Sequence, residues 1–284
     1  MEPIVSVIVS AYNHEKYIYD SLLSIIHQCN YSNIELIVLD DGSADKTPEI
    51  IEDINKVHDF IFIRKKNSGL SDTLNQGLKL ATGKYICQFG SDDIMMPDKT
   101  AKQVQFMENN PDVVCCGGNA SIIDENGQIK NKRQKFPAYR EIRFEHIFAE
   151  TGAGIVASTG MIRKDFLDEY GGWDKNIPLE DIYMWLKITS KSFRMVGLND
   201  VLMYYRKHPN NSYRNTRYMY ESMMKTINDY QEHSLYPKVR LKLLRRYFLN
   251  AAKYDKALAR EILPKIPIKN YNMKVIRGLF KMLA

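Results

Sequence analysis

The stretch I-E-L-I-V-L-D-D-G-S-A-D-K-T-P, residues 34–48, decides the fold class. It begins with a mainly apolar run ending at Asp40, rich in β-branched side chains and typical of a buried strand. A polar turn, D-D-G-S, follows. Thr47-Pro48 then opens a predicted helix, because threonine is a favoured N-cap and proline is favoured at the first helical position.

The same alternation extends along the first 120 residues. Runs typical of buried strands are Ile4–Ala11, Ile34–Asp40, Phe60–Lys65, Tyr85–Gly90 and Val113–Gly117. Helices are predicted over Lys16–Gln28, from Thr47 to about Asn55, over Leu70–Ala81, and from Pro97 to about Asn109. A β-α-β-α order with short connections predicts an α/β fold with a parallel, doubly wound sheet.

The alternation ends after residue 120. A hairpin turn is predicted at 124–127, an irregular stretch at 130–155, strands near 154–162, 193–197 and 201–206, and a helix at 181–190. From about Tyr213 the chain is predicted to be wholly helical. We therefore expect one domain over residues 1–212, with halves 1–120 and 121–212, and a helical C-terminal region over 213–284.

The composition is that of a globular protein, with 44% hydrophobic and 26% charged residues, which excludes a disordered or fibrous chain. The net charge of +6 is unevenly distributed. From Pro237 onward 13 Lys and Arg stand against 2 Asp and Glu, so the preceding residues are slightly acidic. A nucleic-acid partner is not expected, because the body is acidic and the tail lacks interleaved aromatic side chains.

The cysteines and the apolar runs predict a cytoplasmic protein. Cys29, Cys87, Cys115 and Cys116 form no C-x-x-C pair, so all four are predicted to be reduced core thiols. The run from Ile4 to Tyr12 has nine residues, whereas a membrane-spanning helix needs roughly 20. With no basic segment or cleavage site before it, this run is not expected to be a signal peptide.

Two stretches of the tail, 237–249 and 273–283, place apolar side chains on one helical face and basic ones on the other. Such helices bind anionic membrane surfaces, or they pack their apolar face on the body or on a second subunit, as in a homodimer. Both interpretations remain open from the sequence.

Polar clusters follow four of the predicted strands. They are Ser10-Ala11-Tyr12-Asn13, Asp40-Asp41-Gly42-Ser43, Asn67-Ser68-Gly69 and Gly90-Ser91-Asp92-Asp93. Ligands of open parallel sheets bind beyond the carboxyl ends of the strands, so these clusters are expected to meet at one edge. Neither G-x-G-x-x-G nor G-x-x-x-x-G-K-[ST] is present. Paired carboxylates instead suit a divalent ion that holds a phosphate group.

In their order along the chain, these segments resemble the inverting family 2 glycosyltransferases, which have the nucleotide-sugar-binding GT-A fold. The resemblance covers roughly Val5 to Ser212. It rests on V-S-V-I-V-S-A-Y-N (5–13), L-D-D-G-S-A-D (39–45), N-S-G (67–69), N-Q-G-L-K-L-A-T-G-K-Y-I (75–86), S-D-D-I-M-M-P-D (91–98), G-G-W-D (171–174), L-E-D (179–181) and Y-Y-R-K-H-P-N-N-S (204–212).

The resemblance implies a role for each cluster. Donor binding would fall to Ser10, Ala11, Tyr12, Asn13, Asp40, Asp41, Asn67, Ser91, Asp92 and Arg206. Asp40 would accept the N3–H of a uracil or thymine base. A divalent ion, Mn²⁺ or Mg²⁺, would be held by Asp93 and His208. Two positions depart from the family pattern: Gly90 stands where many members have Asp, and Leu74 where many have Arg.

The resemblance also implies a catalytic pair at the start of a predicted helix. Asp181 would be the general base and Glu180 would assist it. Trp173 would either stack on the acceptor sugar or anchor the core. Each cluster also has a purely structural interpretation, as a turn or as the acidic first turn of a helix.

The resemblance thus predicts a metal-assisted inverting glycosyltransferase that moves a sugar from a nucleotide-sugar, foremost a UDP-sugar, to a hydroxyl of a growing bacterial surface glycan. A dTDP- or GDP-sugar donor remains an alternative. So does a non-catalytic nucleotide-sugar or glycan-binding module, because of Gly90 and Leu74. The sugar is expected to be recognised by the 130–160 region. The expected acceptor is a glycan or a lipid-linked glycan at the inner face of the cytoplasmic membrane.

Overall fold

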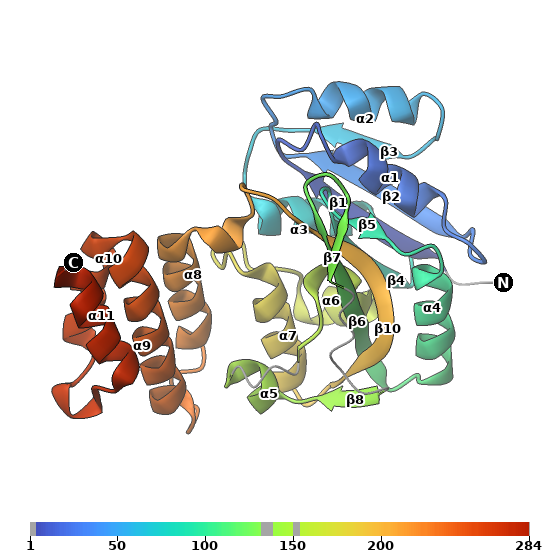
Figure 1. Cartoon of the computed structure of the whole chain (residues 1–284). Coiled ribbons are helices and arrows are strands. Elements are labelled where there is room, and N and C mark those ends of the chain that lie inside the picture. Colours follow the sequence, from blue (N-terminus) through green and yellow to red (C-terminus); the bar gives the residue numbers. More distant parts are fainter. Residues whose placement is uncertain (1–3, 132–138, 150–153, 284) are drawn as a thin grey trace. The chain divides into compact units, whose positions relative to one another are not determined.

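The computed structural model describes residues 4–131, 139–149 and 154–283 (Figure 1). The chain divides into two compact units, Met1–His208 and Pro209–Ala284. The division lies four residues before the predicted one at 212/213. Much of the irregular stretch expected to read the sugar, at 132–138 and 150–153, lies outside the described residues.

The first unit is built on one mixed sheet. Its described strands are β1 (Val5–Ala11), β2 (Ile34–Asp40), β3 (Ile61–Arg64), β4 (Tyr85–Gly90), β5 (Ile94–Met95), β6 (Val113–Asp124), β7 (Ile129–Asn131), β8 (Tyr139–Ile142), β9 (Met161–Arg163) and β10 (Arg194–Lys207). They follow the order β3-β2-β1-β4-β9-β6-β10-β5, with β7 beside β6 and β8 beside β10. Strands β3, β2, β1 and β4 are parallel, as the alternation predicts. Strand β9 runs antiparallel to β4 and β6, which makes the sheet mixed.

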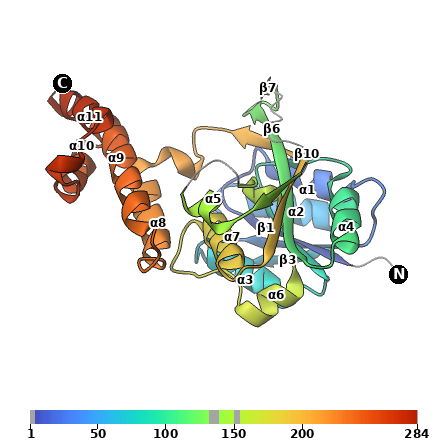
Figure 2. The ribbon, with the colours of Figure 1, turned by 90° about the horizontal axis from the view of Figure 1, so that it is seen from below.

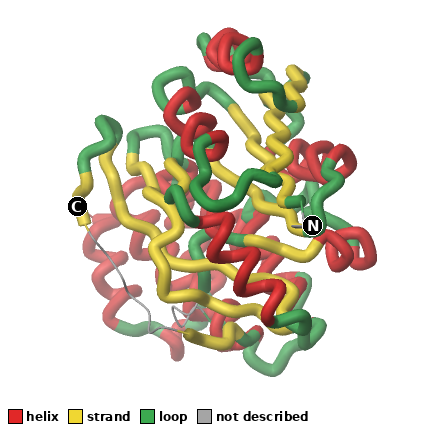
Figure 3. Tube along the Cα trace, turned by 90° about the vertical axis from the view of Figure 1, so that its right-hand side faces the viewer, coloured by secondary structure: helices red, strands yellow, loops and turns green. Residues whose placement is uncertain are grey.

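Helices cover both faces of this sheet (Figures 2 and 3). Those described in the first unit are α1 (Ile18–Ile26), α2 (Thr47–Asn55), α3 (Leu70–Leu80), α4 (Lys99–Asn109), α5 (Phe144–Phe148), α6 (Lys164–Tyr170) and α7 (Glu180–Ser190). Alternate residues of β1 face opposite sides: Val7 packs in the core that contains α1, α2 and α4 side chains, whereas Ile8 packs with those of α3, α6 and α7.

Differences from the predicted elements lie mainly after residue 112. Strand β6 runs through residue 120, so the two predicted halves share one strand and are not separate bodies. The strands expected at 193–197 and 201–206 form a single strand, β10, whose register against β6 shifts between Gly197 and Met203. This irregularity interrupts the apolar alternation and makes one strand look like two.

The prediction of four buried thiols is wrong for one of them. All four cysteines are free, and Cys87, Cys115 and Cys116 are buried, but Cys29 is exposed. Cys29 lies beyond the last residue of α1, in the loop that leads to β2, so no helical face turns it toward the core.

The second unit is helical, with α8 (Thr216–Asn228), α9 (Tyr236–Tyr254), α10 (Lys256–Ile262) and α11 (Met273–Leu283). It has a core of its own, to which α9 contributes Leu243, Leu244, Tyr247 and Phe248. Helix α11 packs on α9 at Gly278, where an added Cβ would lie 2.4 Å from the Phe248 ring. No described helix is both long and apolar enough to cross a membrane.

Helix α11 buries only part of its apolar face. Val275 is fully buried, but Ile276 is 40% and Phe280 70% exposed. The apolar stripe predicted from the sequence is therefore split between packing within the second unit and an exposed apolar strip. That strip is flanked by exposed Lys274 and Arg277 on the same helix.

Candidate functional site

The carboxyl ends of β1, β2 and β4 lie level at one edge of the sheet. Ala11 pairs with Asp40, and Ser10 pairs with Gly90. Ser10 is half-buried, and Ala11 is fully buried, so Ala11 takes part through its carbonyl, which accepts a hydrogen bond from the Asp41 amide at 2.8 Å. The edge therefore brings together the polar clusters that follow these three strands.

The loop after β1 is fastened to the loop after β2. Asn13 has a left-handed backbone (φ 53°). Its amide donates to Ser43 Oγ at 2.9 Å, and its Oδ1 accepts from the Ala44 amide at 2.8 Å. Asn13 thus supports the loop, whereas the side chain of Tyr12 is 48% exposed at its surface.

Asp40 at the end of β2 is fully buried, yet only one of its carboxylate oxygens is hydrogen-bonded. Oδ2 accepts from the Ser43 amide at 3.2 Å. Within the described part of the chain, Oδ1 has no hydrogen-bond partner. A buried carboxylate oxygen without a donor is costly, so this atom is a candidate acceptor for an N–H group of a ligand.

Asp41 is used differently, and the structure argues against its predicted donor-binding role. Its Oδ1 accepts from Lys65 Nζ at 2.5 Å and from the Ser68 amide at 2.9 Å, and its Oδ2 accepts from the Gly69 amide at 3.0 Å. Asp41 therefore holds the loop that follows β3 in place. Asn67, in the same loop, is exposed.

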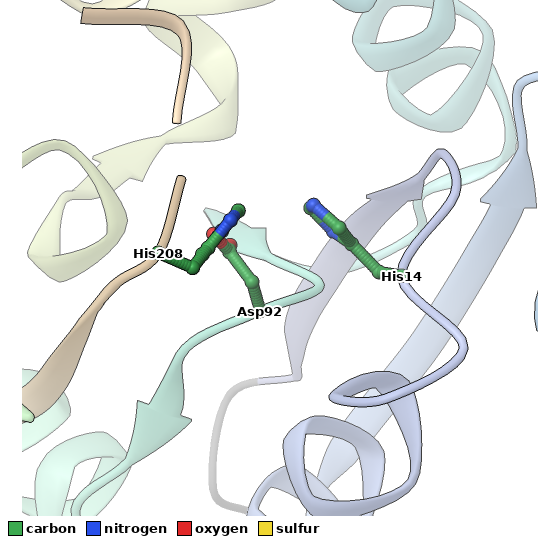
Figure 4. A group of neighbouring side chains, drawn as sticks. All are labelled: His14, Asp92 and His208. Atoms are coloured by element: carbon green, nitrogen blue, oxygen red, sulfur yellow. The ribbon is translucent and has the colours of Figure 1, made fainter. Parts of the chain in front are cut away.

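His14, Asp92 and His208 form a compact cluster at the same edge (Figure 4). They offer two imidazole nitrogens and a carboxylate oxygen that all lie within 4.8 Å of one another. His208 Nε2 lies 2.8 Å from Asp92 Oδ2, and His14 Nδ1 lies 2.7 Å from Ser91 Oγ. The His14 and His208 rings meet edge to face, with centroids 5.5 Å apart.

Three separate segments build this cluster. His14 follows β1, Asp92 follows β4, and His208 follows β10, which reaches this edge because it pairs with β5. Burial opposes ionisation of Asp92, but the hydrogen bond with His208 and the nearby charges of His14 and His208 outweigh it and lower the pKa of Asp92. Burial lowers the pKa of His14, and Asp92 only partly offsets this. The two histidines thus favour the ionised form of Asp92, while burial disfavours the protonated form of His14.

Asp93 is not part of the cluster, and both of its carboxylate oxygens are hydrogen-bonded within the protein, which does not favour its predicted role as a metal ligand. Its Oδ1 accepts from the Arg206 amide at 2.9 Å, and its Oδ2 accepts from Ser158 Oγ at 3.2 Å. Burial and the charge of Asp92 raise its pKa well above the ordinary value. Asp93 therefore joins the turn after β4 to β10, and Asp92 takes the place in the cluster that was predicted for Asp93.

Arg206 is buried, and its described contacts are with the protein. Its Nε donates to the Asp92 carbonyl at 2.8 Å, and its guanidinium lies 4.9 Å from the centre of the Tyr17 ring. It therefore positions the turn that carries Asp92. This placement does not favour the predicted contact of Arg206 with the donor. Ser91, also predicted to bind the donor, is buried against His14.

Glu180 and Asp181 begin α7 and are both half-buried. Burial, followed by the charge of Asp181, raises the pKa of Glu180 to about 8. Burial also raises the pKa of Asp181, although its Oδ1 accepts from the Ile182 amide at 2.7 Å. Two adjacent carboxyl groups with raised pKa values can hold one proton between them and leave one carboxylate as a base.

Trp173 lies in the core and is 3% exposed, so its ring has no free face on which a sugar could stack. The Asn75 side chain holds the backbone at this residue: its Oδ1 accepts from the Trp173 amide at 2.9 Å, and its Nδ2 donates to the Trp173 carbonyl at 2.6 Å. The predicted acceptor-binding role is therefore withdrawn. Trp173 is instead part of the core that packs against α7.

The sequence analysis missed His14. It follows directly after the S-A-Y-N cluster, and its position just beyond the carboxyl end of β1 was the available signal. Pairing it with Asp92 and His208 needed the fold, because the three residues are up to 194 positions apart.

Known proteins resemble this chain over most of its length. The model of the family described as glycosyl transferase family 2 matches residues 6–171. Among curated proteins, UDP-Glc:alpha-D-GlcNAc-diphosphoundecaprenol beta-1,3-glucosyltransferase WfaP of Escherichia coli is 33% identical over 211 residues, which are 72% of this chain and 78% of WfaP.

Two solved structures share the fold. The crystal structure of S. aureus TarS in complex with UDP-GlcNAc has a TM-score of 0.71 at 19% identity, covering 99% of this chain and 88% of that one. The mannosyltransferase PcManGT from Pyrobaculum calidifontis, in complex with GDP-Man and Mn²⁺, has a TM-score of 0.66 at 18% identity, covering 100% and 88%. These likenesses confirm the predicted GT-A fold. Because the family model matches more than half of its residues, this chain belongs to glycosyl transferase family 2 and is a glycosyltransferase.

Proposed function

We propose that this glycosyltransferase moves a sugar, with inversion, from a UDP-sugar to a hydroxyl of a growing bacterial surface glycan. The similarity to WfaP supports both the donor and the acceptor class, because the name of WfaP specifies UDP-Glc and a diphosphoundecaprenol-linked sugar. The TarS structure contains UDP-GlcNAc, which also supports a uridine donor.

The observation that carries the donor proposal is the unpaired, buried Oδ1 of Asp40. A uracil base presents N3–H as a donor, and a charged acceptor makes a stronger hydrogen bond than a neutral one. Exposed Tyr12, one residue beyond β1, supplies a ring that can lie along the base. The donor base would thus be bound between the ends of β1 and β2.

Asp40→Asn tests this proposal. Its remaining oxygen must still accept from the Ser43 amide, which turns the new NH₂ group toward the base. We expect UDP affinity to fall by about tenfold or more and CDP to gain, because cytosine N3 is an acceptor. Calorimetric titration with UDP and CDP measures this, with the exposed Asp53→Asn on α2 as control. Unchanged UDP affinity in the variant would contradict the proposal.

A divalent ion fits the His14–Asp92–His208 cluster, because all three side chains are metal ligands and a ligand set of three leaves positions for phosphate oxygens. When bound, the ion would offset the negative charge that develops on the leaving diphosphate. Arg206 would keep Asp92 oriented toward the ion through its bond to the Asp92 carbonyl.

Asp181 would act as the general base. The acceptor hydroxyl oxygen attacks the anomeric carbon from the face opposite the diphosphate, and the bond between that carbon and the diphosphate oxygen breaks with its electrons. The hydroxyl proton passes to Asp181. Glu180, whose pKa is about 8, would carry the shared proton of the pair and so leave Asp181 ionised near neutral pH.

The alternative functions, a non-catalytic binding module and a transferase that uses a GDP- or dTDP-sugar, have less support. Leu74, one of two departures that suggested a non-catalytic module, is a core residue at 1% exposure. Gly90 is crowded, because an added Cβ would lie 2.9 Å from Asp93 Oδ2 and 3.0 Å from Asp92 Oδ1. Calorimetric titration of the unaltered chain with GDP and dTDP beside UDP distinguishes these donors.

We further propose that the second unit contacts an anionic membrane surface, on which a lipid-linked acceptor would lie. The strip of α11 carries exposed Phe280 and Ile276 beside exposed basic side chains, a combination that binds lipid headgroups and the acyl boundary. Flotation with anionic vesicles is expected to fall for Phe280→Asp. It should not change for Val57→Asp, which alters an exposed apolar residue just beyond the end of α2. Equal flotation of both variants would count against the membrane contact.

A further inference from the structure

The His14–Asp92–His208 cluster offers a set of metal-ligand atoms that the sequence pattern did not suggest. The sequence predicted one carboxylate and one histidine, whereas the structure places two imidazoles beside a single carboxylate. Neighbouring carboxylates do not add to this set. Asp93 is held by the Arg206 amide and Ser158, and position 90 carries no side chain.

The Cβ position of Gly90 faces two carboxylates of the turn after β4. A Cβ on Gly90 would meet Asp93 Oδ2 at 2.9 Å and Asp92 Oδ1 at 3.0 Å. The Gly90 carbonyl also accepts from Ser21 Oγ at 3.0 Å, which holds the turn against α1. Position 90 therefore supplies no side chain to the cluster, and His14 enters it from the loop after β1, the strand that pairs with β4.

His14 is held in place by contacts that reach both its backbone and its ring. Its amide donates to Thr47 Oγ1 at 2.8 Å, and its Nδ1 lies 2.7 Å from buried Ser91 Oγ. If Ser91 accepts from Nδ1–H, the lone pair of the ring lies on Nε2. A second hydrogen bond of this kind commonly orients a metal-binding imidazole. These contacts indicate that the His14 ring is already oriented to act as a metal ligand.

We propose that His14 is a third protein ligand to the ion, replacing the side chain absent at Gly90, and that the resulting two-histidine, one-carboxylate set selects a first-row transition ion such as Mn²⁺ over Mg²⁺. Imidazole nitrogen suits transition ions, whereas Mg²⁺ prefers oxygen ligands and keeps its water. Ligand atoms about 2.1 Å from one ion lie at most ~4.2 Å apart. The separations within the cluster are all within 4.8 Å, so side-chain movements of about half an ångström or more bring the three ligand atoms to one ion.

This inference rests on the proposed function in one respect: it assumes that the ion bound by the cluster is the ion that contacts the diphosphate of the sugar donor. Its test is therefore metal binding to the full chain without any sugar donor. The electron paramagnetic resonance signal of free Mn²⁺ disappears when the ion binds, and added Mg²⁺ measures competition. Wild type, His14→Gln and His14→Asp are compared.

We expect His14→Gln to weaken Mn²⁺ binding about tenfold or more, since even loss of an outer-sphere partner costs 10- to 100-fold. His14→Asp should recover part of the Mn²⁺ affinity and let Mg²⁺ compete better, because the new ligand is an oxygen. His27→Gln, which alters an exposed histidine at the end of α1, is the matched control.

Three outcomes would overturn the inference: Mn²⁺ binding by His14→Gln equal to wild type, an equal loss in His27→Gln, or Mg²⁺ competing as well in wild type as in His14→Asp. If His14→Gln unfolds at a lower temperature than wild type, the inference is tested instead by the ratio of Mn²⁺ affinity to Mg²⁺ affinity in His14→Asp. Failure here leaves the donor proposal untouched, because UDP binding through Asp40 is measured separately.

Discussion

Two acidic pairs stand at strand ends on either side of β1, Asp40-Asp41 at the end of β2 and Asp92-Asp93 after β4, and the fold divides each pair in the same way. In both pairs, the second aspartate is hydrogen-bonded to backbone amides of the protein. Asp41 holds the loop after β3, and Asp93 holds β10. In both, the first aspartate faces the site edge.

The pairs differ in what surrounds that first aspartate. Asp40 keeps one buried oxygen without a hydrogen bond, whereas Asp92 has His208 and His14 beside it. A lone acceptor suits an N–H donor, and a carboxylate among imidazoles suits a cation. The comparison teaches that the partner groups, rather than the acidic residues, separate the base-binding position from the metal position.

The largest expected effect concerns a third acidic pair, Glu180-Asp181, in which the second member is proposed to act on substrate. Asp181→Asn removes the base and is expected to lower transfer by roughly 10³-fold. Binding of UDP should change little, since Asp40 is unaltered. Titration of the same sample with UDP provides the control. A loss of UDP binding equal to the loss of transfer would place Asp181 in the donor site instead.

Asp93→Ala should lower the free energy of unfolding more than Asp92→Ala does. It leaves the buried Arg206 amide and Ser158 hydroxyl without their acceptor, which costs about 1–3 kcal/mol each time such a group loses its bond. Asp92→Ala should instead weaken Mn²⁺ binding with a smaller loss of stability. Urea unfolding and metal titration of both variants measure this. Equal stabilities would show that the two aspartates are not divided as described.

Asp41→Ala and Asp40→Asn repeat the comparison at the other pair. Asp41→Ala removes the acceptor of two loop amides and of Lys65, and we expect a loss of about 1–2 kcal/mol. Asp40→Asn removes a buried charge whose Oδ1 is unpaired, so its stability should equal or slightly exceed that of wild type. Thermal unfolding of the two variants without ligand tests this. A larger loss in Asp40→Asn would contradict it.

The smallest effect concerns pH. The pKa of Glu180 is raised to about 8 in the folded chain. As the pH rises, the unfolded chain therefore releases the Glu180 proton before the folded chain does. The contribution of Glu180 to stability is fully present below pH of about 4.5 and is lost as the pH rises toward 8. Glu180→Gln should flatten the fall in stability across this range, measured by urea unfolding at pH 5, 6, 7 and 8. An unchanged slope would mean that Glu180 is ionised in the folded chain.

The elements predicted from periodicity before residue 112 match the structure closely, because each strand or helix there buries a face whose spacing is local. The predicted helix over 70–81 is α3, and the predicted strand over 34–40 is β2. The prediction failed where register changes within a strand, as in β10, and where a loop residue such as Cys29 has no periodic context.

The amino-acid sequence by itself indicated the GT-A class, through the resemblance of its ordered motifs to family 2 glycosyltransferases. It also indicated the edge at which the site lies, because the polar residues that follow each strand are read from short local segments. Only the tertiary structure decided which member of each acidic pair faces the site edge. Adjacent side chains diverge, and the one that accepts from a backbone amide of a distant segment is held by the protein. The tertiary structure alone also brought His14 to Asp92 and His208, since that meeting depends on the packing of three strand ends.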